Sequence, residues 1–138
     1  MSGQTFEQVL REKGFLVYTC TGFSMLPLLR ERQDIVEIRP KPEGRCRKYD
    51  VILYKRGGQY ILHRVLKVLP EGYLVAGDHN TFVDPAVTDD MILGVMVRVI
   101  RGGKSVRPTD WRCRLYVLLW CVPWRLRMAL LKVWRRLH

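Results

Sequence analysis

The chain has 138 residues, 48% hydrophobic and 27% charged, a composition typical of a globular protein and not of a disordered one. This length suits one domain with a buried core, and four cysteines without a Cys-x-x-Cys pair fit neither a disulfide framework nor a zinc ribbon. The net charge of +11 is uneven: residues 101–138 carry ten Lys/Arg and one acidic residue, net +9, and residues 1–100 carry net +2.

The N-terminal residues predict a short helix. Thr5 and Gln8 form a capping-box pattern, so we expect a helix over residues 6–13 that ends at Gly14, within an N-terminal element of residues 1–14. The first residues are polar and lack the apolar core of a signal peptide. We therefore expect the bulk of the chain on the cytoplasmic side.

From residue 15 to residue 104 the chain has the pattern of short strands separated by Gly/Pro turns. The expected strands are 15–20, 34–39, 50–55, 59–68, 72–76 and 93–101. No long helix separates them and no segment repeats. The sequence therefore predicts a mainly β fold, either a curled antiparallel sheet or a small barrel.

Residues 22–27 place the Ser24 hydroxyl at a turn after an apolar run. An isolated serine at such a turn most often hydrogen-bonds its own backbone. Two later segments favour chemistry instead: His63 lies inside an apolar strand pattern, and Asp78 follows another strand. Serine, histidine and an acid are the components of an acyl-transfer site.

These motifs, in this order, resemble those of type I signal peptidases. The resemblance is carried by Gly-x-Ser-Met-x-Pro at 22–27, Ile-Leu-His-Arg-Val at 61–65, Gly-Asp-x-Asn at 77–80 and Ile-Leu-Gly-Val-Met-Val at 92–97. It is closest to the branch with a Ser–His pair, which comprises archaeal, sporulating-bacterial and endoplasmic-reticulum enzymes. It implies a catalytic domain over residues 15–104 and a serine endopeptidase that cleaves a leader or signal segment from a precursor.

The resemblance also assigns roles to residues. Ser24 matches the nucleophile, its backbone N–H contributing to the oxyanion hole, and His63 matches the general base. Asp78 matches the acid of the Gly-Asp-x-Asn box, and Asp84 matches a second acid six residues further on. Of the two, we expect Asp84 to orient His63 and Asp78 to support the structure. The chemistry is coherent because neutral imidazole accepts a serine proton near neutral pH.

Three positions depart from the family pattern. Gln33 and Tyr49 stand where the family usually has glycine, and Gly22 stands where many relatives have a serine that assists the oxyanion. Loss of one oxyanion donor costs on the order of 100- to 1,000-fold in rate. We also expect this chain to lack the N-terminal transmembrane anchor that is typical of the family.

These departures leave an alternative open. The fold could persist as a basic, membrane-associated binding module whose catalytic residues are unused. A self-cleaving relative of the repressor type is a weaker alternative, because those proteins use a lysine base and carry an upstream DNA-binding domain.

Neither a cofactor nor a metal is expected. His79 lies beside Asp78 and could suggest a metal site with His63 and Asp84, but no ligand spacing supports one. Arg64 follows His63 and should point to the opposite face of the sheet, which suggests a structural ion pair.

Residues 105–138 form a tail of a different kind. The segment 115–122 is apolar all round but has only eight residues, and a bilayer span needs about 20. Pro123 ends this run and is followed by a helical pattern. Its apolar side carries Leu126, Leu130, Val133, Trp134 and Leu137, and its basic side carries Arg125, Lys132 and Arg136. Arg127 falls within the apolar half.

A basic amphipathic helix rich in Trp and Leu is typical of the membrane interface. We therefore expect residues 111–138, from Trp111 to His138, to attach the protein peripherally to a membrane. The other expected partner is a precursor peptide or protein. Packing of this helix on its own domain or on a partner protein is the alternative, and nucleic acid is not favoured.

Overall fold

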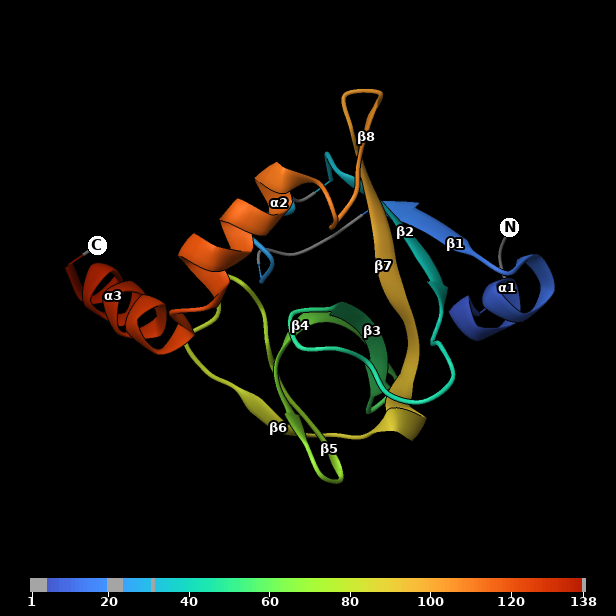
Figure 1. Cartoon of the computed structure of the whole chain (residues 1–138), viewed down its shortest axis with the longest axis horizontal. Coiled ribbons are helices and arrows are strands. Elements are labelled where there is room, and N and C mark those ends of the chain that lie inside the picture. Colours follow the sequence, from blue (N-terminus) through green and yellow to red (C-terminus); the bar gives the residue numbers. More distant parts are fainter. Residues whose placement is uncertain (1–4, 20–23, 31, 138) are drawn as a thin grey trace.

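A computed structural model describes residues 5–19, 24–30 and 32–137 and has a mainly β architecture (Figure 1). Eight strands form one antiparallel sheet in the order β1-β2-β7-β3-β4-β5-β6, with β8 paired to β7. The sheet is not closed into a barrel. The predicted fold class is therefore confirmed, and the small barrel is not the form that the chain adopts.

The strands follow the turn signals closely. They are β1 Leu16–Thr19, β2 Ile35–Pro40, β3 Val51–Arg56, β4 Gln59–Leu69, β5 Gly72–Ala76, β6 Asp84–Val87, β7 Ile92–Arg101 and β8 Lys104–Val106. All six expected strands are present within about one residue at each end. The sequence analysis missed β6 and β8, which have four and three residues and so show little alternation.

The helices lie at the two ends of the chain. They are α1 Phe6–Lys13, α2 Trp111–Tyr116, the π-helical η2 Val117–Cys121 and α3 Trp124–Leu137, with the short 3-10 turn η1 Asp89–Met91 before β7. The capping box of α1 is confirmed: Thr5 Oγ1 accepts from the Gln8 N–H at 3.1 Å, and Gln8 Oε1 accepts from the Thr5 N–H at 2.9 Å. Gly14 ends this helix with φ +77°.

Glycine pairs set the register of two hairpins. Gly57 and Gly58 both have positive φ, 57° and 81°, which suits a tight two-residue turn between β3 and β4. The resulting register places Ile52 of β3 opposite His63 of β4. Since side chains alternate along a strand, Ile52 and Tyr54 lie on one face of β3. This register decides which side chains surround His63.

Two separate apolar clusters, each built from different strand residues, pack against the sheet. One cluster lies under α1 and includes Leu10, Leu16, Leu29, Val36, Ile38, Leu53 and Met96. A second cluster includes Ile52, Tyr54, Val65, Tyr73, Val75 and Val87. Tyr54 is therefore a core residue that carries a hydroxyl into an apolar cluster.

The C-terminal helices pack at the end of the molecule opposite α1 (Figure 1). Met128 of α3 joins Leu66 and Ala76 in a third small cluster. Within the described part of the chain, no helix is both long and apolar enough to cross a bilayer.

Candidate active site

Ser24 lies in the turn between β1 and β2 and packs against the loop 77–80 that follows β5. Its backbone oxygen accepts a hydrogen bond from the His79 N–H at 2.8 Å. A Cβ on Gly77 would lie 2.4 Å from the Ser24 carbonyl oxygen and 2.9 Å from the Ser24 Cβ, so this approach requires glycine. The loop therefore fixes the position of Ser24.

His63 is half-buried on β4. Burial lowers the pKa of its imidazole to about 4, although the carboxylates of Asp78 and Asp84 act in the opposite direction. The ring is therefore neutral at physiological pH, as proton acceptance requires.

Tyr54 connects His63 to Asp84. The Tyr54 hydroxyl lies 3.3 Å from His63 Nδ1 and donates to Asp84 Oδ2 at 3.5 Å. A phenol has one proton, so a hydroxyl that donates to Asp84 can only accept from an Nδ1–H. This assignment of the tautomer leaves a lone pair on His63 Nε2, the form that a general base needs.

Asp84 is held in place at the start of β6. Arg56 Nη2 forms an ion pair with its Oδ2 at 3.0 Å, and the Ala86 N–H donates to Oδ1 at 3.0 Å. Burial, and next the charge of Asp84, raise the pKa of Tyr54, so this hydroxyl keeps its proton. Tyr54 thus lies between Asp84 and His63.

Asp78 has a different set of partners. It is fully buried and accepts from Arg64 Nε at 2.9 Å and Arg64 Nη2 at 3.0 Å, which is the ion pair expected for Arg64. Tyr116 Oη donates to Asp78 Oδ2 at 2.6 Å, and Trp120 Nε1 donates to the Asp78 carbonyl at 2.8 Å. Among the described residues, no hydrogen bond joins Asp78 to His63. Asp78 therefore locks the loop 77–80 to β4 and to the C-terminal helices.

Ser24 and His63 are connected through the end of the β4–β5 pair. Ser24 packs on Gly77, which follows Ala76, and Ala76 pairs with Arg64, the residue after His63. No direct hydrogen bond joins the Ser24 and His63 side chains in the described part of the chain. Catalytic hydrogen bonds are often long or poorly aligned before substrate binds, so the absence of this contact does not exclude a catalytic pair.

A cleft of about 700 Å³ opens beside Ser24. It is lined by Phe6, Tyr18, Thr19, Ser24, Met25 and residues 58–62. β1 is an edge strand of the sheet. The residues of β4 before Arg64 have no pairing partner in β5. Both walls of the cleft thus carry strand edges without a second partner among the described elements, and such edges suit an extended peptide.

Sequence reasoning missed Tyr54, Tyr116 and Trp120. A signal was present, because a buried Tyr or Trp usually finds a partner for its O–H or N–H. The run 115–122 looked uniformly apolar, although Tyr116 and Trp120 turn polar atoms towards Asp78. The expectation for Gly22 lies outside the described residues.

The described residues contain no cluster of three or more His, Cys, Asp or Glu that could hold a metal ion. Cys46, Cys113 and Cys121 are free thiols. Burial raises the pKa of Cys121 to about 12, so its thiol is protonated and inert at neutral pH.

In comparisons with known proteins, no family model, no characterised protein and no solved structure matches this chain. Support for a function therefore comes from the geometry of the residues and from the motif resemblance.

Proposed function

We propose that this chain is a serine endopeptidase similar to type I signal peptidases, with Ser24 as nucleophile and His63 as general base. Asp84 orients His63 through Tyr54, and Asp78 supports the loop beneath Ser24. The substrate is a precursor peptide or protein from which a leader or signal segment is removed.

The observation that carries this proposal is the orientation of His63. Its Nδ1 is occupied by Tyr54 and its pKa is lowered by burial, so Nε2 is an unprotonated acceptor. Gly77, which holds Ser24, directly follows Ala76, and Ala76 pairs with Arg64, the residue after His63. Tyr54 also links this histidine to the carboxylate of Asp84.

The reaction follows from this arrangement. Ser24 Oγ attacks the scissile carbonyl carbon, and its proton passes to His63 Nε2. The tetrahedral intermediate collapses, the C–N bond breaks, and the amine leaves with the proton from His63. Water then attacks the acyl-enzyme with His63 again as base and releases the acid and free Ser24.

The cleft favours an extended substrate. A peptide strand can pair with the free edges of β1 and of residues 59–62 while its scissile bond lies at Ser24. Met25 lines the same cleft. The family resemblance adds an expectation of small side chains next to the scissile bond.

The test is cleavage of a diverse peptide library, read by mass spectrometry, with anionic vesicles present. Wild type is compared with Ser24→Ala, His63→Ala and the control Ser105→Ala, which changes an exposed serine on β8. We expect wild type and Ser105→Ala to cleave after small residues and the other two variants to be inactive.

Other outcomes have definite meanings. Cleavage that survives Ser24→Ala would show that the site assignment is wrong. If all four proteins are folded and none of them cleaves the library, the alternative of a basic membrane-associated binding module is favoured.

A further inference from the structure

The first helical segment of the tail, formed by α2 and η2, exposes an apolar stripe. The stripe consists of Trp111, Leu115, Leu118, Leu119 and Val122, which are between 43% and 68% exposed. Their spacing of three or four residues places them on one side of the helix. The other side is used internally, because Tyr116 and Trp120 bond to Asp78.

A second apolar stripe follows on α3. It consists of Leu126, Leu130, Val133, Trp134 and Leu137, which are between 52% and 75% exposed. The buried residues of this helix are Arg127, Met128 and Leu131, and the two apolar ones lie on the side opposite the stripe. The helix thus packs on the protein by its narrower apolar side and turns its larger one outward. We name the two stripes together the C-terminal apolar surface.

Such a surface needs an occupant. Soluble monomers rarely expose a continuous apolar patch of more than a few hundred Å² without a binding role. All four tryptophans of the chain lie in residues 111–134, two of them in the stripes. Tryptophan is enriched where apolar and aqueous phases meet.

The charges around the C-terminal apolar surface identify the kind of partner. Arg112 and Arg114 are exposed beside the first stripe, and Arg125, Lys132 and Arg136 are exposed beside the second. Residues 111–138 contain no Asp or Glu. A second copy of the chain would bring like charges together, whereas an anionic surface complements them.

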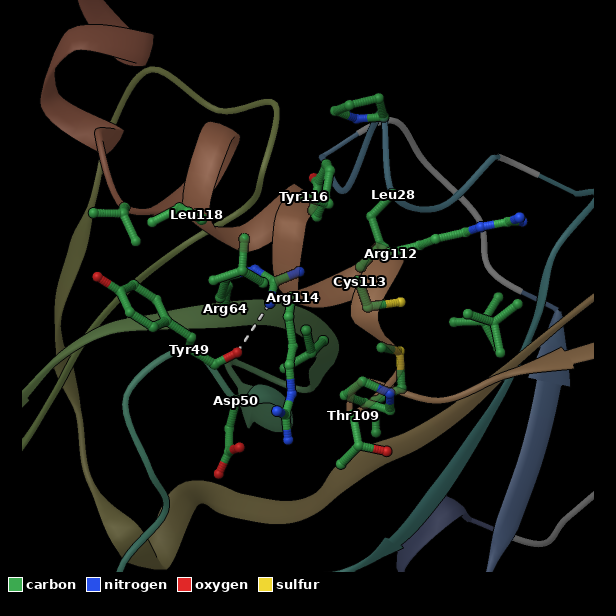
Figure 2. Close-up of a pocket in the computed structure, with 18 of the residues that line it drawn as sticks. Leu28, Tyr49, Asp50, Arg64, Thr109, Arg112, Cys113, Arg114, Tyr116 and Leu118 are labelled. Atoms are coloured by element: carbon green, nitrogen blue, oxygen red, sulfur yellow. Dashed lines mark hydrogen bonds between the residues drawn. The ribbon is translucent and has the colours of Figure 1, made fainter.

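A cavity adjoins the first stripe (Figure 2). Its volume is about 750 Å³, and Leu118 and Val122 line it together with apolar residues of the sheet such as Met96 and Val99. Exposed Arg112 and Arg114 line it as well, so apolar depth and cationic groups occur together. This combination suits an amphiphile with an anionic head.

We infer that the C-terminal apolar surface docks the protein onto an anionic lipid bilayer, with the two stripes in the interface and the Arg/Lys side chains at the headgroups. Helices of this kind lie in the interface and do not span it. The inference does not depend on peptidase activity.

The test uses full-length Ser24→Ala protein, so that no cleavage occurs, with vesicles of phosphatidylcholine alone or mixed with phosphatidylglycerol. We expect cosedimentation and a blue shift of tryptophan emission with the anionic vesicles only, and weaker binding in higher salt. Two of the four tryptophans, Trp111 and Trp134, lie in the stripes, so the emission includes a signal from this surface.

Two variants and a matched control locate the contact. Leu119→Glu and Leu130→Glu, each in one stripe, should weaken the partition at least about 10-fold, because a charge replaces a side chain that enters the interface. Val68→Glu makes the same charge change at a residue 38% exposed on β4, outside the surface, and should bind as its parent does. Circular dichroism confirms that each variant is folded.

Three outcomes would overturn the inference. The first is equal binding to neutral and anionic vesicles or to neither. The second is concentration-dependent self-association that Leu119→Glu or Leu130→Glu abolishes, which would make the occupant a second copy. The third is unchanged vesicle binding by both stripe variants.

Discussion

Tyr54 shows how one hydroxyl can decide the state of a neighbouring ring. It lies between His63 Nδ1 and Asp84 Oδ2, so the hydrogen bonds that connect the acid to the base run through it. A direct His–Asp contact would make Tyr54 dispensable. The geometry instead makes it a positioning residue.

We expect Tyr54→Phe to lower kcat by about 10- to 100-fold with little change in KM, because the ring keeps its packing while His63 loses its orientation. Asp84→Asn should have a similar effect, and the double variant should be no worse than either single one. Steady-state kinetics on a peptide found by the library screen provide the measurement. Tyr73→Phe removes another buried hydroxyl of the sheet and serves as control. Additive losses would show that the two residues act separately.

The burial of His63 predicts an unusual pH profile. Its pKa is lowered from 6.5 to about 4, so kcat/KM should stay near its maximum down to about pH 5 and fall with a midpoint near 4. The pH dependence of peptide cleavage measures this limb, and His79→Asn should leave it in place. An acid limb near 6.5 would mean that His63 is solvated in the free enzyme.

The same shift affects stability. Between pH 6.5 and 4 the unfolded chain protonates this histidine while the folded protein does not. The contribution of His63 to stability is therefore present above 6.5 and is lost as pH falls towards 4. Tryptophan emission should be recorded alongside activity so that unfolding is not mistaken for protonation.

At the level of elements, α3 contains a buried charge without a hydrogen-bonding partner. Arg127 is 3% exposed, and none of its three guanidinium nitrogens has a hydrogen-bond partner among the described residues. Its guanidinium lies 5.9 Å from the centre of the Trp120 ring, a cation–π contact that offsets part of the cost. Helix periodicity placed this arginine within the apolar half, but gave no reason for its burial.

Replacing this charge should stabilise the protein. We expect Arg127→Met to raise the free energy of unfolding by about 1 to 3 kcal/mol, because a flexible apolar side chain removes an uncompensated desolvation cost. Urea unfolding followed by tryptophan fluorescence measures the change. Arg125→Met, at an exposed position of the same helix, should stay within about 0.5 kcal/mol of wild type. A loss of stability in Arg127→Met would contradict this prediction and show that the cation–π contact with Trp120 outweighs the desolvation cost.

At the scale of the whole molecule, local signals predicted the regular elements well. Turn glycines and strand alternation predicted β1 to β5 and β7, because hairpin geometry is encoded in adjacent residues. The short β6 has no such signal and is defined by pairing of Asp84 with Val75. It could not be predicted because the pairing forms only when the chain has folded back.

The candidate site was predicted in part. Motif resemblance singled out Ser24, His63, Asp78 and Asp84 and favoured Asp84 as the partner of His63, but it did not indicate which side chains connect the two acids to their surroundings. Those connections depend on Tyr54 from β3 and on Tyr116 and Trp120 from the tail. These contacts join residues as many as 42 positions apart, which no local pattern encodes.

The attachment of Asp78 to the tail also has a consequence for the nascent chain. A ribosome synthesises Ser24, His63 and Asp84 well before Tyr116, which follows Asp78 by 38 residues. Until α2 and η2 emerge, the loop 77–80 lacks its contacts to Tyr116 and Trp120. The loop that packs against Ser24 is therefore among the last parts to be completed, and the helices that complete it, α2 and η2, present the first apolar stripe. During synthesis the candidate site is therefore completed only when the helices that carry the first exposed apolar stripe have formed.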